Sequence, residues 1–152
     1  MAFCHLHGTA VHLTVNTLVF DRELPSAMET VRAACEAGAD AVLVQDLGVA
    51  RMVRQAAPDL PLHASTQMSL HNLSGVQLLE PFGYTRAVLA REMNAEEIAQ
   101  VCRGTTMEIE TFVHGALCMC LSGQCYLSAV AGERSGNRGL CAQPCRLPFY
   151  EK

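Results

Sequence analysis

Short strand-like runs that alternate with helical stretches are the feature that most constrains the fold of this chain. The runs are rich in apolar and β-branched residues and occupy residues 11–17, 41–45, 60–65, 87–90 and 107–113. Strands joined through helices need crossover connections, which are almost always right-handed and leave neighbouring strands parallel. The sequence therefore predicts an α/β fold built on a parallel sheet.

Helical periodicity fills the gaps between these runs, at residues 24–37, 49–57 and 73–82 and from Asn94 onward. Gly38 and Gly83 follow the first and third helical stretches as expected for helix ends, and Pro58 stops the second. Asn94 with Glu97 resembles a capping box at the start of the fourth. These signals indicate four helices between five strands.

The strand spacing of about 20 to 30 residues suits a (β/α) barrel, but a complete eight-stranded barrel needs about 250 residues. With 152 residues, we expect a partial (β/α) TIM-like barrel over residues 1–114, followed by a cysteine-rich metal-binding segment over residues 115–152. The alternative is an open doubly wound sheet. A partial barrel exposes strand edges, so missing barrel segments or a partner subunit are expected to cover them.

Polar residues at the carboxyl ends of the strands face the active side of either architecture. Asn16 and Gln67 are candidates for substrate binding. Arg91 and Glu92 form an adjacent charged pair, which is costly at a strand end unless it is paired or functional, and the two explanations weigh equally. Three further residues at these ends are expected only to cap the next helix: Asp46, Thr66 and Ser69.

The composition narrows the class of protein. Half of the residues are apolar, and the net charge of −4 gives no reason to expect non-specific nucleic-acid binding. No apolar run reaches the ~18 residues of a membrane span, and the first residues lack a signal-peptide pattern. We therefore expect a cytoplasmic protein without a membrane partner, in which disulfides are disfavoured and the eight cysteines need another explanation.

Five of the eight cysteines fall within 28 residues that are also rich in glycine and arginine: Cys118, Cys120, Cys125, Cys141 and Cys145. Thiolates are strong ligands for zinc and for iron–sulfur clusters. The last four have a spacing that resembles a zinc ribbon and match neither common ferredoxin pattern, so spacing alone leans toward zinc. Cys35 and Cys102, in contrast, lie on apolar helix faces and are expected in the core.

Several motifs in this chain resemble the signature of the U32 peptidase family, the collagenase-like proteases. The resemblance covers residues 11 to 150 and is nearest to the ribosomal-RNA hydroxylation branch, partly through residues 45–51. The motifs that carry it are residues 13–17, 63–67, 88–92, 110–118, 122–128 and 134–146.

The resemblance implies a barrel-like catalytic domain. The family name implies peptidase activity, whereas other members are implicated in oxygen-independent hydroxylation of transfer RNA, ribosomal RNA or the ubiquinone ring. Several of those hold a [4Fe–4S] cluster on four cysteines, with prephenate as a suggested oxygen source. By position, Cys118, Cys125 and Cys141 are the firmest ligands and Cys145 is the fourth, while Cys120 is additional. The resemblance therefore favours an iron–sulfur cluster over zinc.

Three functions follow from these observations. The first is an iron–sulfur-dependent enzyme, or a fragment of one, that hydroxylates pyrimidines of ribosomal or transfer RNA. The second is a peptidase, although the chain has no G-x-S-x-G or H-E-x-x-H motif, and a Cys118 that binds a cluster cannot also be a nucleophile. The third is a non-enzymatic, zinc-stabilised fragment or subunit.

The remaining candidate residues flank the cysteines. His114 and Glu110 join Arg91 and Glu92 as catalytic candidates. Three arginines of the cysteine-rich segment could contact RNA phosphates or a substrate carboxylate, or could compensate thiolate charge and stabilise loops: Arg134, Arg138 and Arg146.

Overall fold

The computed structural model describes residues 1–150. Within them, no helix is long and apolar enough to cross a membrane. The helices and strands occur in the order α1 (Ala2–Leu6), β1 (His12–Val15), α2 (Leu24–Glu36), β2 (Ala41–Val44), α3 (Leu47–Ala56), β3 (Leu62–Ala64), α4 (Leu73–Leu79), β4 (Tyr84–Val88), α5 (Ala95–Gly104), β5 (Glu108–Glu110) and α6 (Leu127–Gly132).

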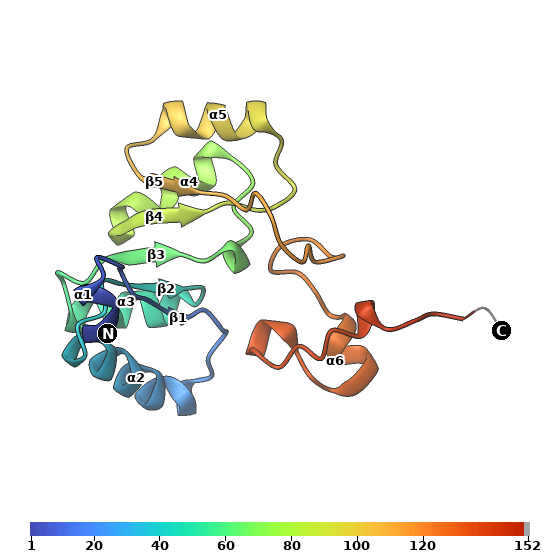
Figure 1. Ribbon diagram of the computed structural model, residues 1–152, viewed down its shortest axis with the longest axis horizontal. Helices are drawn as coiled ribbons and strands as arrows, with labels where there is room; N and C mark the ends of the chain where they lie inside the picture. Colours follow the sequence, from blue (N-terminus) through green and yellow to red (C-terminus); the bar gives the residue numbers. More distant parts are fainter. Residues whose placement is uncertain (151–152) are drawn as a thin grey trace.

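The five strands form one parallel sheet in which each strand pairs with the next along the chain (Figure 1). The spatial order β1-β2-β3-β4-β5 is the sequential order of a (β/α) barrel. A doubly wound sheet instead changes direction at a switch point. The α/β fold with a parallel sheet is therefore confirmed, and the doubly wound alternative is wrong.

One face of the sheet packs on the helices and forms the core. Val42 and Leu62 from the strands belong to the same buried apolar cluster as Val49, Val76 and Val101 from α3, α4 and α5. Each of these five side chains is at most 1% exposed. Burial of a Val or Leu side chain stabilises a fold by about 1.5–3 kcal/mol. This apolar layer fixes the carboxyl ends of the strands at one edge of the molecule.

The opposite face of the sheet is polar. The strand register places His63 beside Arg86, and Arg86 beside Glu108. Arg86 Nη2 lies 2.7 Å from Glu108 Oε2, and the His63 ring packs against the His12 ring with centroids 4.9 Å apart. His63 is 4% exposed and its Nδ1 has no hydrogen-bond partner within residues 1–150.

His63 makes the stability of the fold depend on pH. Burial, with help from the charges of Arg86 and His12, lowers the pKa of His63 from 6.5 to about 4. The neutral form favours the folded state, so its contribution is complete above pH 6.5 and is lost as the pH falls toward about 4. We expect the urea midpoint to decline over that interval. The His63→Gln variant should flatten the decline, whereas His7→Gln, at the exposed residue that follows α1, should not.

The helix ends follow the expected signals with two exceptions. The Asp46 carboxylate accepts hydrogen bonds from two amides of the first turn of α3, which confirms it as a cap. Asn94 and Glu97 form the predicted capping box of α5. The predictions for Thr66 and Ser69 are wrong. Thr66 donates to the carbonyl of Leu89, Ser69 adopts a left-handed conformation with φ of 58°, and Asn72 caps α4 instead.

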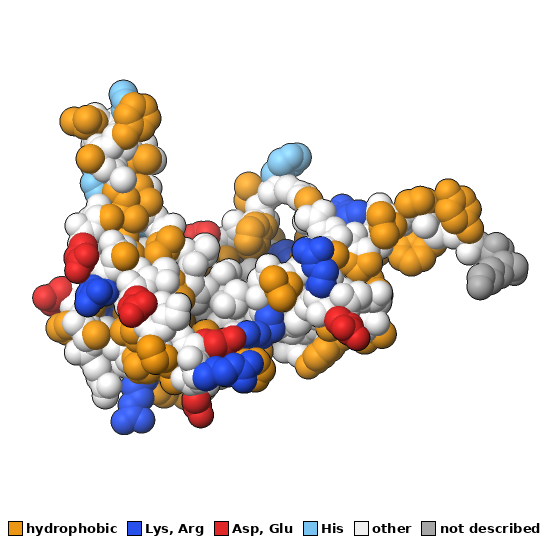
Figure 2. Space-filling view, turned by 90° about the horizontal axis from the view of Figure 1, so that it is seen from below, with side chains coloured by type: hydrophobic (Ala, Val, Ile, Leu, Met, Phe, Trp, Pro, Cys, Tyr) orange, Lys and Arg blue, Asp and Glu red, His pale blue; other side chains and the backbone are white. Residues whose placement is uncertain are grey.

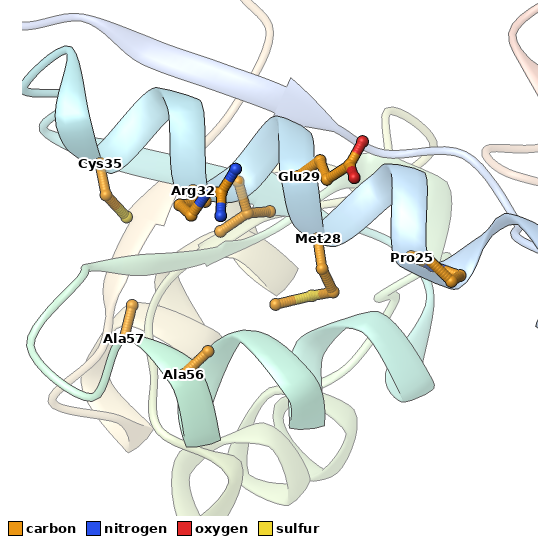
Figure 3. A pocket seen from close by; sticks show the side chains of 8 residues that line it. Pro25, Met28, Glu29, Arg32, Cys35, Ala56 and Ala57 are labelled. Atoms are coloured by element: carbon orange, nitrogen blue, oxygen red, sulfur yellow. The ribbon is translucent and has the colours of Figure 1, made fainter.

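The prediction that Cys35 and Cys102 lie in the core is also wrong, because both are exposed. Figure 3 shows Cys35 at the end of α2, beside a pocket between α2 and α3 that Met28 and Ala57 also line. The two cysteines belong to α2 and α5, the first and last helices that cover the sheet. In the helix layer, α2 packs against α3 and α5 packs against α4.

Several boundaries differ from the expected ones. The fourth strand begins at Tyr84 rather than residue 87, directly after Gly83, whose φ of +80° turns the chain out of the preceding helix. The fifth strand ends at Glu110 rather than residue 113, because β5 is an edge strand that pairs only with β4 within the described residues. The short α1 was not expected. It is held to the sheet by His5 Nε2, 2.9 Å from Asp40 Oδ2.

Candidate functional site

All five cysteines of the cysteine segment, residues 118–145, line one cavity of about 360 Å³. They come from the stretches before and after α6. Thr66 and Gln67, which follow β3, Arg91, which follows β4, and Asn137 also line it. Figure 1 shows that the segment lies beyond the carboxyl ends of the strands. The fold therefore brings the clustered thiols to the edge of the sheet where barrel enzymes place their active sites.

Ser122 fastens the cysteine segment to the sheet. Its side chain is 0% exposed, and its amide and hydroxyl lie 3.1 and 3.3 Å from Glu92 Oε1. Its carbonyl accepts a hydrogen bond from Ser69, and its hydroxyl accepts one from the Arg91 amide at 3.2 Å. Burial raises the pKa of Glu92, but hydrogen bonds from its own amide and from Ser122 outweigh burial and leave it below the usual value. Glu92 thus acts as an ionised acceptor that holds this contact.

Gly123 lets the backbone of the cysteine segment touch the backbone after β3. A Cβ atom at this position would lie 2.1 Å from the carbonyl oxygen of Gln67 and 2.8 Å from Ser69 Oγ. Its φ of +72° is also in the left-handed region that favours glycine. Only glycine fits at this contact.

A second contact ties the other end of the segment to β1. The Leu18 amide donates to the carbonyl of Asn137 at 3.0 Å. The Arg138 guanidinium reaches both oxygens of Glu23, at 2.8 and 2.6 Å, and packs over the Phe20 ring at 4.5 Å. The segment is therefore held at two places, near β3 and β4 and near β1.

The Arg138–Glu23 pair should respond to acid. The Arg138 hydrogen bond, with a backbone contact from Phe20, lowers the pKa of Glu23 from 4.5 to about 2. A depressed carboxyl pKa stabilises the contact above pH 4.5, and this contribution is lost as the pH falls toward 2. We expect proteolysis of the cysteine segment by pepsin to accelerate over that interval. Glu23→Gln should remove this part of the pH dependence, whereas Glu29→Gln on α2 should leave it unchanged.

The thiols differ in their hydrogen bonds. Cys141 Sγ accepts from the Gln143 amide at 3.4 Å, the type of contact that stabilises a thiolate. The Cys120 thiol instead donates to the carbonyl of Gln124 at 3.6 Å. In residues 1–150, no three Cys, His, Asp or Glu side chains are grouped tightly enough to hold a single metal ion. The cysteines line the cavity without converging on the position of a single ion.

Arg91 also borders a second hollow, of about 470 Å³. Residues 112–117, between β5 and the cysteine segment, form the rest of its lining, and His114 belongs to this stretch. No hydrogen bond joins His114 to Cys118 among the described residues. Glu110 does not contribute to either hollow, and its carboxylate lies 3.3 Å from Arg86 Nη1 on the polar face of the sheet.

Comparison with known proteins places this arrangement in a family. The sequence profile of peptidase family U32 matches residues 1–151. The chain belongs to peptidase family U32. This confirms the family resemblance of the sequence motifs.

Curated U32-type relatives carry names of two kinds. The chain is 41% identical over 150 residues to the 23S rRNA 5-hydroxycytidine C2501 synthase of Escherichia coli K12, covering 99% of this chain and 22% of that protein. It is 36% identical to the tRNA hydroxylation protein P of the same organism, covering 95% and 32%. It is 35% identical to a collagenase of Porphyromonas gingivalis W83, covering 98% and 38%.

A solved structure supports the fold. The U32 peptidase Mk0906 superposes with a TM-score of 0.58 at 17% identity, over 72% of this chain and 48% of that chain. At this level of identity the likeness concerns the fold alone. The chain spans about a fifth to two fifths of the length of the curated relatives named above.

The predicted substrate-binding residues of this U32 chain lie in different places. Gln67 lines the cysteine cavity. Asn16, which follows β1, has its Nδ2 atom 3.4 Å from Oγ of Ser65, which follows β3. Arg134 donates to the carbonyl of Leu140, and Arg146 donates to that of Leu117. Arg138 anchors the segment as described above. These contacts favour the loop-stabilising role of the arginines, and their contact with substrate stays a prediction.

Sequence reasoning missed the residues that position the cysteines. Ser122 and Gly123 were read only as part of a motif, although a serine and a glycine between closely spaced cysteines are a signal for a buried turn. Glu23 and Phe20 were not singled out, because nothing local relates them to an arginine more than a hundred residues away.

Proposed function

We propose that this chain carries the cluster-binding part of an iron–sulfur-dependent RNA hydroxylation enzyme. Cys118, Cys125, Cys141 and Cys145 would hold a [4Fe–4S] cluster. The observation that carries the proposal is the convergence of these four thiols on one cavity at the carboxyl ends of the strands. Relatives named for ribosomal and transfer RNA hydroxylation support the choice of substrate class.

The size of the cavity favours a cluster over zinc. A zinc ion needs four ligands at about 2.0–2.3 Å from one centre, whereas the thiols here line a cavity of larger size. Four thiolates around about 360 Å³ match a larger inorganic core, which takes four cysteines and accepts hydrogen bonds from nearby donors. The amide contact to Cys141 is of this kind.

The same hydrogen bonds explain why four cysteines are proposed rather than five. Cys120 is additional to the cysteines of the family pattern, and its sulfur lies 3.6 Å from the carbonyl oxygen of Gln124. Arg91 Nη2 donates to the backbone carbonyl of Cys120 at 3.4 Å. Cys120 therefore belongs to the wall of the cavity and contributes its main chain.

The cluster, when bound, supplies one-electron chemistry. The chain's own residues supply the environment: Met119, Leu121 and Leu127 give the cavity an apolar lining, and Arg91 would offset the negative charge of the thiolates. RNA is the proposed partner and prephenate the proposed oxygen-donating co-substrate. We infer a cytoplasmic protein in which residues 1–114 are part of a larger barrel, completed by further segments, and residues 115–152 carry the cluster.

A peptidase function has less support. It needs a nucleophile with a base, and the pair conceivable from sequence, Cys118 with His114, shares no hydrogen bond among the described residues. Cys118 is also a proposed cluster ligand.

Anaerobic purification followed by iron, sulfide and zinc analysis tests the cofactor. We expect about four irons and four sulfides per chain and a visible charge-transfer band. Stoichiometric zinc without iron would contradict the proposal. Mass analysis of ribosomal and transfer RNA from a deletion strain, with and without the restored gene, tests the reaction. An unchanged hydroxylation profile in both strains would argue against RNA as substrate.

A further inference from the structure

His71 connects two of the residues that hold the cysteine segment. Its Nδ1 lies 2.7 Å from the carbonyl oxygen of Ser69, and its Nε2 lies 3.1 Å from Glu92 Oε2. Both partners also contact Ser122. The Ser69 hydroxyl donates to the Ser122 carbonyl, and Glu92 Oε1 accepts from the Ser122 amide and hydroxyl. The four residues therefore form a closed ring of hydrogen bonds, which His71 completes.

The cysteine segment depends on contacts of this kind because it projects from the rest of the molecule. Figure 2 shows the carboxyl-terminal part of the chain extending to the right, with many apolar side chains on its surface. Leu121 and Gly123, the neighbours of Ser122, line the cysteine cavity, as do Cys120 and Cys125. The position of Ser122 therefore fixes one wall of the cavity.

Both partners of the His71 ring are hydrogen-bond acceptors. A carbonyl oxygen can only accept. Glu92 is ionised, since burial raises its pKa but hydrogen bonds from its own amide and from Ser122 bring the pKa below the usual value. Each ring nitrogen must therefore donate a proton if both contacts are to form at once. A neutral imidazole has one N–H group and the imidazolium has two, so the ring of contacts is complete only when His71 is charged.

The charged groups around His71 are few within the described part of the chain. Residues 72–74, at the start of α4, line a hollow of about 390 Å³ with His71 and carry no charge. Glu97, from α5, also lines it, but its carboxylate accepts an amide hydrogen bond of the α5 capping box at 2.8 Å. Arg91 lies 3.9 Å from Glu92 Oε1, the oxygen that faces Ser122. The His71 side chain is 37% exposed, so it can exchange protons with solvent.

We propose that His71 is a positioning residue that holds the cysteine segment in a pH-dependent way. The imidazolium braces Ser69 and Glu92, which together fix Ser122 and the wall of the cavity. When the ring loses its second proton, one nitrogen becomes an acceptor that faces another acceptor, and that contact is lost. A histidine changes charge between about pH 5 and pH 8. The hold on Ser122 is therefore complete at the acidic end of this interval and weakens as the pH rises.

The proposed function gives this hold a use. The bracing of Ser122 stands on the contacts alone, whereas its consequence for a cofactor rests on the proposed function. A cysteine segment that loosens as the pH rises would retain a cluster more firmly at the acidic end of the interval. His71 would then regulate retention of the cofactor through Glu92 and Ser122, without touching it.

Hydrogen exchange of the intact protein at about pH 6 and about pH 8, read by mass spectrometry, tests the proposal. After correction for the pH dependence of exchange in an unfolded chain, we expect protection of the Ser122 amide to fall about tenfold or more at the higher pH, because a charge-assisted hydrogen bond is lost. Exchange at the ring carbon of His71, measured on the same samples, follows the titration of the ring. The fall in protection should coincide with that titration.

Three variants separate the charge of His71 from its shape. His71→Gln carries no charge, so the Ser122 amide should be weakly protected at both pH values. His71→Lys keeps a charged donor throughout the interval, so protection should be retained at the higher pH. Glu92→Gln introduces an amide nitrogen that can donate to the neutral ring, so the pH dependence should be abolished. His7→Gln, at an exposed residue, should behave like the unaltered protein.

Equal protection of Ser122 at both pH values in the unaltered protein would overturn the proposal. So would a pH dependence that persists in His71→Gln, or a fall in protection that does not follow the titration of the His71 ring. Metal analysis of the same samples separates the two proposals. Zinc in place of iron, with a pH-dependent Ser122 amide, sinks only the cluster, and iron–sulfur content with a pH-independent amide sinks only the role of His71.

Discussion

Replacing Cys141 with serine should remove nearly all iron from the anaerobically purified protein and abolish its visible absorption. Cys141 is the ligand candidate whose sulfur accepts an amide hydrogen bond, from Gln143 at 3.4 Å. It follows α6 in the chain, whereas Cys118 and Cys125 precede this helix, so its loss removes a thiol that the other side of the segment contributes. A cluster that normally has four thiolates is expected to lose stability when one becomes a hydroxyl.

Cys120→Ser is the matched control for this prediction. Cys120 lines the same cavity and is close in sequence to two proposed ligands, but its thiol donates to the Gln124 carbonyl, a bond that a serine hydroxyl can also make. Iron content and absorption should therefore stay near those of the unaltered protein. Equal loss of iron in both variants would show that the choice of four ligands from five is mistaken.

Gly123→Ala should detach the cysteine segment from the sheet. The added Cβ would lie 2.1 Å from the Gln67 carbonyl oxygen, and both groups belong to the backbone, so neither can turn aside. Strain of a left-handed residue and overpacking each cost about 1–3 kcal/mol. We expect a loss of about 2–4 kcal/mol in the free energy of unfolding measured with urea, together with loss of iron.

Two other glycines separate the causes of that effect. Gly8 has a φ of +68° but open space around its Cβ position, so Gly8→Ala measures the conformational strain without the clash. Gly132, in α6, has neither the unusual φ nor a close neighbour, and Gly132→Ala should be neutral or slightly stabilising. If Gly123→Ala costs no more than Gly8→Ala, the contact with Gln67 does not hold the segment.

The fold was largely predictable because its signals are local. Alternation of apolar runs with helical periodicity gave five strands in a parallel sheet, and Asp46 and Asn94 gave helix starts, since each of these depends on neighbours in sequence. The choice between a barrel order and a doubly wound order depends on which side of the sheet each crossover passes, and no local pattern encodes that. The exposure of Cys35 and Cys102 likewise depends on where α2 and α5 lie in the layer of helices that covers the sheet.

The residue types of the site were predictable from the sequence, but the contacts that hold the cysteine segment against the sheet were not. The density of cysteines pointed to a metal centre, and the structure gathers them around one cavity. The contacts of Ser122 with Glu92 and of Arg138 with Glu23 join residues far apart in the chain, so spacing could not reveal them.

The order of the strands has a consequence for how the protein matures. Every strand pairs with the one made just before it, so the sheet can assemble stepwise as the chain emerges, with short loops to close at each step. The contact of Arg138 with Leu18 spans 120 residues and can form only after all five strands have been made. We therefore expect the thiols to become organised last, on a sheet already in place, so that capture of the proposed cluster would report the completion of folding.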